Sequence, residues 1–221
     1  TLIKAIKKAE VQGKGKASEA RSPFTDPEYR RIMHIIEETG DIGKRLFCSA
    51  VLRYQLAMGA RVDDTAKLSK TNIKCNSEPA LEQLSLTTKL CWSKNIQEEK
   101  QGMYMMLLFE LLFIYYCRHL TLSFFVSVHD QILFGAGDVD YCVLLGLASF
   151  MEYSIEQGWD QSSDHLFCLD GSNCPITIKD KVSSILSMIL ADPTFIEVLT
   201  DDEKKVGTHS IRKFAATYAR R

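Results

Sequence analysis

Two basic side chains near the end of the chain have the residue types and the spacing of an anion site. His209 and Arg212 lie three residues apart in the segment 207–212, so a helix places them on one face. The start of a helix attracts phosphate through its free amide groups and its dipole, and a guanidinium can form two parallel hydrogen bonds to phosphate oxygens. Because this pair of residues is also common on ordinary protein surfaces, it indicates phosphate binding only together with other residues.

Other kinds of chemistry have little support in the sequence. It contains no G-x-G-x-x-G or G-x-x-x-x-G-K-[ST] phosphate loop, no H-E-x-x-H zinc motif and no G-x-S-x-G nucleophile elbow. The five histidines are isolated from one another, and no two cysteines form a C-x-x-C pair. We therefore predict no metal site.

Two more segments place basic residues in a set order along the chain. In residues 56–68 (LAMGARVDDTAKL) a predicted helix ends at a glycine, Arg61 follows, and Asp64 comes three residues later. In residues 84–94 (LSLTTKLCWSK) the β-forming side chains predict a strand that contains Lys89. Lys94 then lies in the turn or at the start of the next strand. An arginine at a helix end is by itself usually a surface residue, so the order of the segments is the informative observation.

In this order, the segments resemble the catalytic domain of tyrosine recombinases, the phage-integrase family of enzymes that break and rejoin DNA. Residues 208–221 (THSIRKFAATYARR) are similar to the H-x-x-R helix of that family. Residues 56–68 are similar to its first-arginine box, and residues 90–94 to the β-hairpin that contains its catalytic lysine. Residues 92–95 and 132–135 are most similar to the recombinases of crypton-type eukaryotic transposons.

The resemblance implies a reaction and a role for each matching residue. Such enzymes attack the scissile phosphodiester with a tyrosine hydroxyl, which leaves a 3′-phosphotyrosyl bond and a free 5′-hydroxyl. Arg61 and Arg212 are then expected to bind the phosphate oxygens, where negative charge accumulates in the transition state. His209 is expected to hydrogen-bond the phosphate and to assist proton transfer. Asp64 is expected to orient Arg61 or His209 from behind.

The resemblance also implies the remaining contacts and the partners. Lys94 is expected to protonate the departing 5′-oxygen, and Lys89 takes this role if the strand register differs. Lys89 is also expected to contact duplex DNA, together with Lys213, Arg220 and Arg221 from the last helix. No cofactor is needed, because the energy of the broken bond is kept in the protein–DNA ester. The full-length protein is expected to form a homo-tetramer on paired DNA sites.

The sequence departs from the family pattern at its end. The family's second His or Trp and its nucleophilic tyrosine lie a few dozen residues beyond the H-x-x-R helix, whereas this sequence ends nine residues after Arg212. Tyr218 lies within that helix and is expected to pack rather than to attack. We therefore expect a partial catalytic domain with no nucleophile in this chain, which binds phosphate without cleaving DNA.

A second departure lies in the middle of the chain. Residues 102–130 have no counterpart in the family pattern and are rich in large apolar side chains. Joining residue 101 to residue 131 gives continuous family-like sequence, so we hypothesise an insertion foreign to the domain, such as a translated intron. A buried helix and a membrane segment are the alternatives, although Glu110, Arg118 and His119 interrupt the apolar run.

Two other functions stay open. The chain can be a non-catalytic DNA-binding descendant of the same fold. It can also be a helical interaction protein or a membrane-associated protein that uses residues 103–128. This last alternative predicts that Arg61, His209 and Arg212 lie far apart in the folded chain.

The composition sets limits on all of these functions. The 221 residues are 46% hydrophobic and 25% charged, as in ordinary globular proteins, which argues against disorder and against a multi-span membrane protein. Because the net charge is −1, DNA binding must come from local charge, such as the basic linker at residues 1–22 and the last helix. Seven cysteines and the absence of a secretory signal favour free thiols in an intracellular protein, nuclear if eukaryotic.

The elements that must position the candidate residues are mainly helical. One domain is expected over residues 23–221, after the linker, with the mixed α+β fold of the recombinase catalytic domain, mainly α-helical with a small antiparallel sheet at the edge. The expected elements are helices from about residue 26, over 44–58, within 59–68, over 141–156, over 177–190 and from 208; a strand over 84–92; an extended piece over 164–169; and an apolar turn over 195–199.

Overall fold

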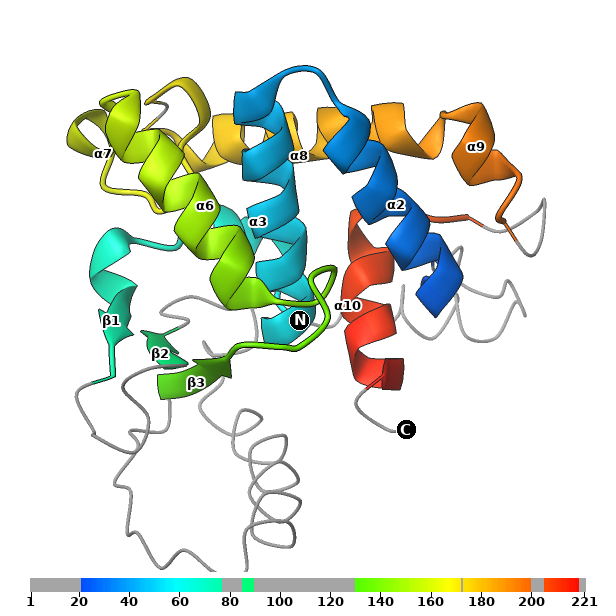
Figure 1. Ribbon diagram of the computed structural model, residues 1–221, viewed down its shortest axis with the longest axis horizontal. Helices are drawn as coiled ribbons and strands as arrows, with labels where there is room; N and C mark the ends of the chain where they lie inside the picture. The colour runs from blue at the N-terminus through cyan, green and yellow to red at the C-terminus, as the bar shows by residue number, and fades with distance from the viewer. Residues whose placement is uncertain (1–20, 77–84, 90–129, 172, 200–204, 219–221) are drawn as a thin grey trace, which may run out of the picture.

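The computed structural model describes residues 21–76, 85–89, 130–171, 173–199 and 205–218. These residues are mainly helical and include a small antiparallel sheet of three strands, which confirms the predicted α+β class, mainly α-helical with a small antiparallel sheet (Figure 1). Most of the linker predicted at residues 1–22 lies outside the described residues. None of the described helices is both long enough and apolar enough to cross a membrane.

Helix α3 (Ile42–Met58) is the central element of the fold. Asp41 caps its start by accepting a hydrogen bond of 3.0 Å from the amide of Lys44. The helix ends at Gly59, whose φ of 54° is a left-handed conformation that glycine adopts without strain. The helices α2 (Asp26–Glu38), α6 (Val143–Glu156), α8 (Pro175–Leu190) and α10 (Thr208–Tyr218) all pack against α3.

The first described helix has the start that the sequence predicts. Thr25 is the N-cap of α2, its amide donates a hydrogen bond of 2.7 Å to Glu28, and Pro27 lies in the first turn. Shorter elements complete the chain: α4 (Val62–Ala66), η1 (Lys70–Asn72), α7 (Trp159–Ser162), η2 (Leu169–Gly171) and α9 (Pro193–Ile196). The residues predicted as an extended piece over 164–169 form an isolated bridge from His165 to Ser69 and then the turn η2.

The sheet lies at one edge of the helical body (Figure 1). Its strands β1 (Ile73–Cys75), β2 (Ser85–Lys89) and β3 (Asp130–Phe134) pair in the order β1-β2-β3. A buried hydrogen bond of 2.9 Å between Tyr54 Oη and Thr88 Oγ1 joins β2 to α3. The sheet therefore has a fixed position relative to the C-terminal half of the central helix.

Strand β3 was not expected from the sequence. It pairs with β2 so that Lys89 lies opposite Asp130, and a strand over 130–134 has no partner that is near it in sequence. Of the insertion hypothesised at residues 102–130, only residue 130 is described, and it is the first residue of β3. The remainder, including the apolar residues 103–128, lies outside the described part.

A cluster of charged residues, the Arg30 cluster, fastens α2 to the connection between β3 and α6. It consists of Arg30 and three carboxylates, at 3.1 Å from Asp26, 2.7 Å from Asp138 and 3.3 Å from Asp140. The hydroxyl of Tyr141 donates a hydrogen bond to Asp26, and the guanidinium of Arg30 lies 5.0 Å from the centre of the Tyr141 ring. Each carboxylate of the cluster thus has the same cation as a partner.

Candidate functional site

The backbone around Arg61 is fixed by the short helix that follows it. Arg61 is the N-cap of α4, and its carbonyl accepts hydrogen bonds of 3.0 Å from both the amide and the hydroxyl of Thr65. Its amide donates a hydrogen bond of 3.3 Å to Asp64. Because the left-handed turn at Gly59 ends α3 two residues earlier, the chain reverses here and Arg61 lies beside the end of the central helix.

Helix α10 is held by its apolar face. Ile211 and Phe214 are buried, and the ring of Phe214 lies 5.4 Å from that of Tyr29 in α2. At the start of the helix, the buried hydroxyl of Ser210 accepts a hydrogen bond of 3.0 Å from the amide of Gly207. With these residues inward, His209 and Arg212 lie on another side of the helix.

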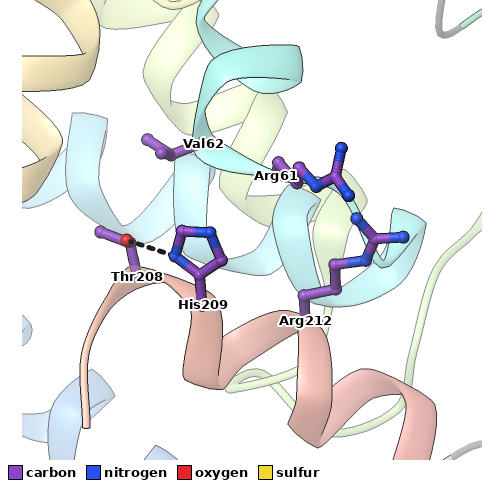
Figure 2. Close-up of a pocket in the computed structure, with 5 residues that line it drawn as sticks. All are labelled: Arg61, Val62, Thr208, His209 and Arg212. Carbon is purple, nitrogen blue, oxygen red and sulfur yellow. Dashed lines mark hydrogen bonds between the residues drawn. The ribbon is translucent and has the colours of Figure 1, made fainter. Parts of the chain in front are cut away.

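The structure brings Arg61, His209 and Arg212 together around one small pocket. Val62 and Thr208 complete its lining. Figure 2 shows the guanidinium groups of Arg61 and Arg212 pointing toward one another from different elements, with the ring of His209 beside them. The Nδ1 atom of His209 lies 3.5 Å from the hydroxyl of Thr208, a long contact whose donor depends on the tautomer of the ring. Residues separated by about 150 positions in sequence thus meet at one place.

Positive charge in this pocket exceeds the negative charge available to balance it. The Nη1 atom of Arg61 is buried and has no hydrogen-bond partner in the described structure. Burial and the nearby Arg61 lower the pKa of Arg212, whereas Asp64 raises it. A guanidinium remains protonated despite such a shift, so two like charges face each other with one carboxylate near them.

Asp64 is the acidic residue behind the two arginines. It is buried, and burial raises the pKa of its carboxyl group, against the lowering effects of the Arg61 amide and of the two guanidinium groups. The carboxylate of Asp64 thus lies next to Arg61 through the main-chain amide of that residue. No contact of Asp64 with His209 is seen in the described residues.

The other predicted residues are placed as follows. Lys89 is exposed at the end of β2, one residue after the Thr88 that bonds to α3. Lys213 is exposed on α10, and its Nζ atom donates a hydrogen bond of 2.5 Å to the carbonyl of Arg21. Lys94, Arg220 and Arg221 lie outside the described residues.

Tyr218, at the end of α10, packs against other aromatic rings. Its ring stacks on that of Tyr141, with centroids 5.5 Å apart and an interplanar angle of 14°, and lies 5.7 Å from that of Phe214. It is not among the residues that line the pocket. The expectation that Tyr218 packs agrees with this position.

The pocket offers cations and hydrogen-bond donors to an anion. The first amides of α10 have no carbonyl within the helix to bond to, and the first turn contains no acidic residue. Thr208 and Val62 were not predicted as site residues from the sequence. The one signal that could have indicated them is that they are adjacent in sequence to His209 and Arg61. Over the described ranges, no three His, Cys, Asp or Glu side chains gather as a metal site.

Comparison with known proteins gave no relatives: no family model, no curated protein and no solved structure matches this chain.

Proposed function

We propose that this chain binds duplex DNA and that the pocket formed by Arg61, His209 and Arg212 binds one backbone phosphate. The single observation that supports this most is the pair of guanidinium groups that face each other, with the buried Nη1 atom of Arg61 lacking a partner among the described residues. Leaving a buried polar donor without a partner costs free energy. A phosphate accepts hydrogen bonds from two guanidinium groups at once and neutralises their repulsion.

The chemistry of the pocket fits a phosphoryl-transfer site of the tyrosine recombinase type, and we propose this activity for an assembly in which a tyrosine nucleophile reaches the pocket. Arg61 and Arg212 would stabilise the charge on the non-bridging oxygens of the transition state. His209 is exposed beside them, and its ring nitrogens can form a hydrogen bond to the phosphate. A lysine would protonate the 5′-oxygen; Lys94 and Lys89 are the candidates.

A non-catalytic DNA-binding role is the second candidate, and one observation favours it. Among the described residues, none that lines the pocket is a tyrosine, and Tyr218 is stacked on Tyr141 instead. Phosphotyrosyl chemistry therefore needs a nucleophile other than the tyrosine nearest in sequence. We propose that the chain, as it stands, binds DNA without cutting it.

Binding of a labelled mixed-sequence duplex by the Arg212→Ala variant tests the proposal. Loss of a charge-assisted hydrogen bond to phosphate should weaken binding by about tenfold or more. Thermal stability should not fall, because the substitution also removes the repulsion between Arg212 and Arg61. Arg212→Lys keeps the charge but not the two-pronged geometry of the guanidinium. Its affinity for the duplex should lie between those of the parent chain and of the Arg212→Ala variant.

The control is Lys44→Ala, which removes an exposed cation at the opposite end of α3, about 25 Å from Arg61 for a helix of this length. This variant should bind DNA within about twofold of the parent chain. Equal affinity of the parent chain and the Arg212→Ala variant would overturn the proposal.

A further inference from the structure

The chain that enters the described part of the structure is held against the start of α10. The amide of Ser22 donates a hydrogen bond of 2.8 Å to the carbonyl of Lys205, and Lys213 donates one of 2.5 Å to the carbonyl of Arg21. The guanidinium of Arg21 lies directly on Gly207, because a methyl group added to this glycine would come within 1.9 Å of the Arg21 Nη1 atom. Main chain and side chain of Arg21 are therefore both placed beside the first turn of α10.

This is an unfavourable place for a cation. The start of a helix has a partial positive charge, so a nearby guanidinium is repelled rather than attracted. The first turn of α10 has no acidic residue to offset this repulsion, and among the described residues Arg21 forms no ion pair. Arg212 and Lys213 add further positive charge on the same helix.

Gly207 has a specific reason to be glycine at this position. Its φ is not in the left-handed region, so the backbone does not require glycine there. A side chain at position 207 would occupy the space that the Arg21 guanidinium fills. Glycine thus allows Arg21 to approach the helix start closely.

We propose that Arg21 is a further phosphate-contacting residue, and that it binds the DNA phosphate next to the one in the Arg61–His209–Arg212 pocket. This inference rests on the proposed function. Gly207, against which Arg21 lies, is two residues from His209, so their Cα atoms are at most about 7 Å apart. The two groups can therefore serve neighbouring phosphates of one strand that passes over the start of α10.

The substitution Arg21→Ala tests whether the charge of Arg21 contributes to DNA binding. The substitution Gly207→Ala tests whether the position of its guanidinium at the start of α10 matters. Both are compared with the parent chain and with Arg212→Ala in titrations of a labelled 30-base-pair duplex over a series of salt concentrations. Arg21→Ala should weaken binding by about fivefold and reduce the slope of log K against log salt by about 0.9, as expected for the loss of one phosphate contact. Lys44→Ala, the control on α3, should change neither value.

Gly207→Ala keeps the charge of Arg21 but displaces its guanidinium, so it should lower the salt slope by a similar amount. In the Arg21→Ala background the same substitution should have no further effect on binding, because there is no guanidinium left to displace. This comparison separates displacement of Arg21 from a change in the helix start itself.

The outcomes distinguish the inference from the proposed function. If Arg212→Ala weakens binding and Arg21→Ala does not, the role of Arg21 is overturned while the pocket remains. If Arg21→Ala weakens binding and Gly207→Ala leaves it unchanged, the assigned place of Arg21 at the helix start is overturned. If neither arginine matters, both proposals fall.

Discussion

Arg30 and Arg212 are both arginines on helices that pack around the same core, but their surroundings are opposite. Arg30 contacts the carboxylates of Asp26, Asp138 and Asp140 within 3.3 Å and lies over the ring of Tyr141. Arg212 faces the guanidinium of Arg61 across a small pocket, with the buried Asp64 as the nearby carboxylate. One region has an excess of negative charge around its cation, and the other has an excess of positive charge.

The difference indicates what each region does. In the Arg30 cluster the charged groups satisfy one another and connect α2 to the chain between β3 and α6, so the cluster contributes to the fold. In the pocket the cations are held close together by backbone structure, at Gly59, at α4 and at the start of α10, and they lack an equivalent partner. Charge that the fold leaves unbalanced is suited to an external anion.

The largest effect should come from giving the pocket a carboxylate of its own. In Thr208→Asp, an acidic side chain in the first turn of α10 would pair with the two arginines and with the helix dipole. Stability should rise by about 0.3–1 kcal/mol, while DNA binding should fall by about tenfold or more, because the carboxylate occupies the place of the phosphate. Thermal unfolding and duplex titration measure the two changes.

The matched control for this change is Thr208→Asn, which has nearly the same shape without the charge. It should retain most of the DNA affinity and gain less stability. If Thr208→Asp binds DNA as tightly as the parent chain, the pocket is not the phosphate site.

A smaller effect, opposite in sign for the two regions, is expected in the dependence of stability on pH. The hydrogen bond from Tyr141 lowers the pKa of Asp26, and Arg30 lowers the pKa of Asp138. Their contribution to stability is therefore present above a pH of about 4 and is lost as the pH falls through their lowered pKa values. Burial raises the pKa of Asp64, so its contribution is present in acid and is lost as the pH rises through the raised value.

Urea unfolding at a series of pH values between neutral pH and about pH 3 measures how the free energy of unfolding changes with pH. Arg30→Gln should make the loss of stability in acid shallower, because Asp138 then has no cation to lower its pKa. Asp64→Asn should make it steeper, because the opposing contribution is gone. Changes in the same direction for the two variants would contradict the distinction between the regions.

The smallest effect is expected for Tyr218→Phe. The substitution keeps the ring that stacks on Tyr141 and removes only the hydroxyl of a half-exposed side chain. DNA affinity should stay within about twofold of the parent value, because we assign the hydroxyl no contact with phosphate, and stability should change by less than about 0.5 kcal/mol. A clear loss of DNA binding would instead place this hydroxyl in the site.

Local signals predicted much of the fold. Thr25 and Pro27 marked the start of α2, and Gly59 marked the end of α3, because capping and left-handed turns depend on a few adjacent residues. The strand β3 could not be found in this way. Its stability depends on pairing with β2, and residues 90–129 separate the two strands, so no nearby residue indicates it.

The candidate site shows the same division. Arg61, His209 and Arg212 were found because each lies in a short segment of recognisable pattern, and the structure brings these segments together. Arg21 has no such pattern around it. Its place depends on contacts with Gly207 and with Lys213, which is 192 residues away, and only the folded chain shows them. The ion pairs of Arg30 with Asp138 and Asp140 also join residues that are far apart in sequence, by 108 and 110 positions, and were missed for the same reason.

The hydrogen bonds that join Arg21 and Ser22 to the other end of the domain also make a mechanical connection. Lys213 and Lys205 both belong to the segment that contains His209 and Arg212. A pull or a torque applied to the chain ahead of Arg21 therefore reaches the first turn of α10 directly, without passing through the core. Any domain or ligand attached to that leading segment is in a position to shift His209 and Arg212 on α10 and so to change the shape of the pocket.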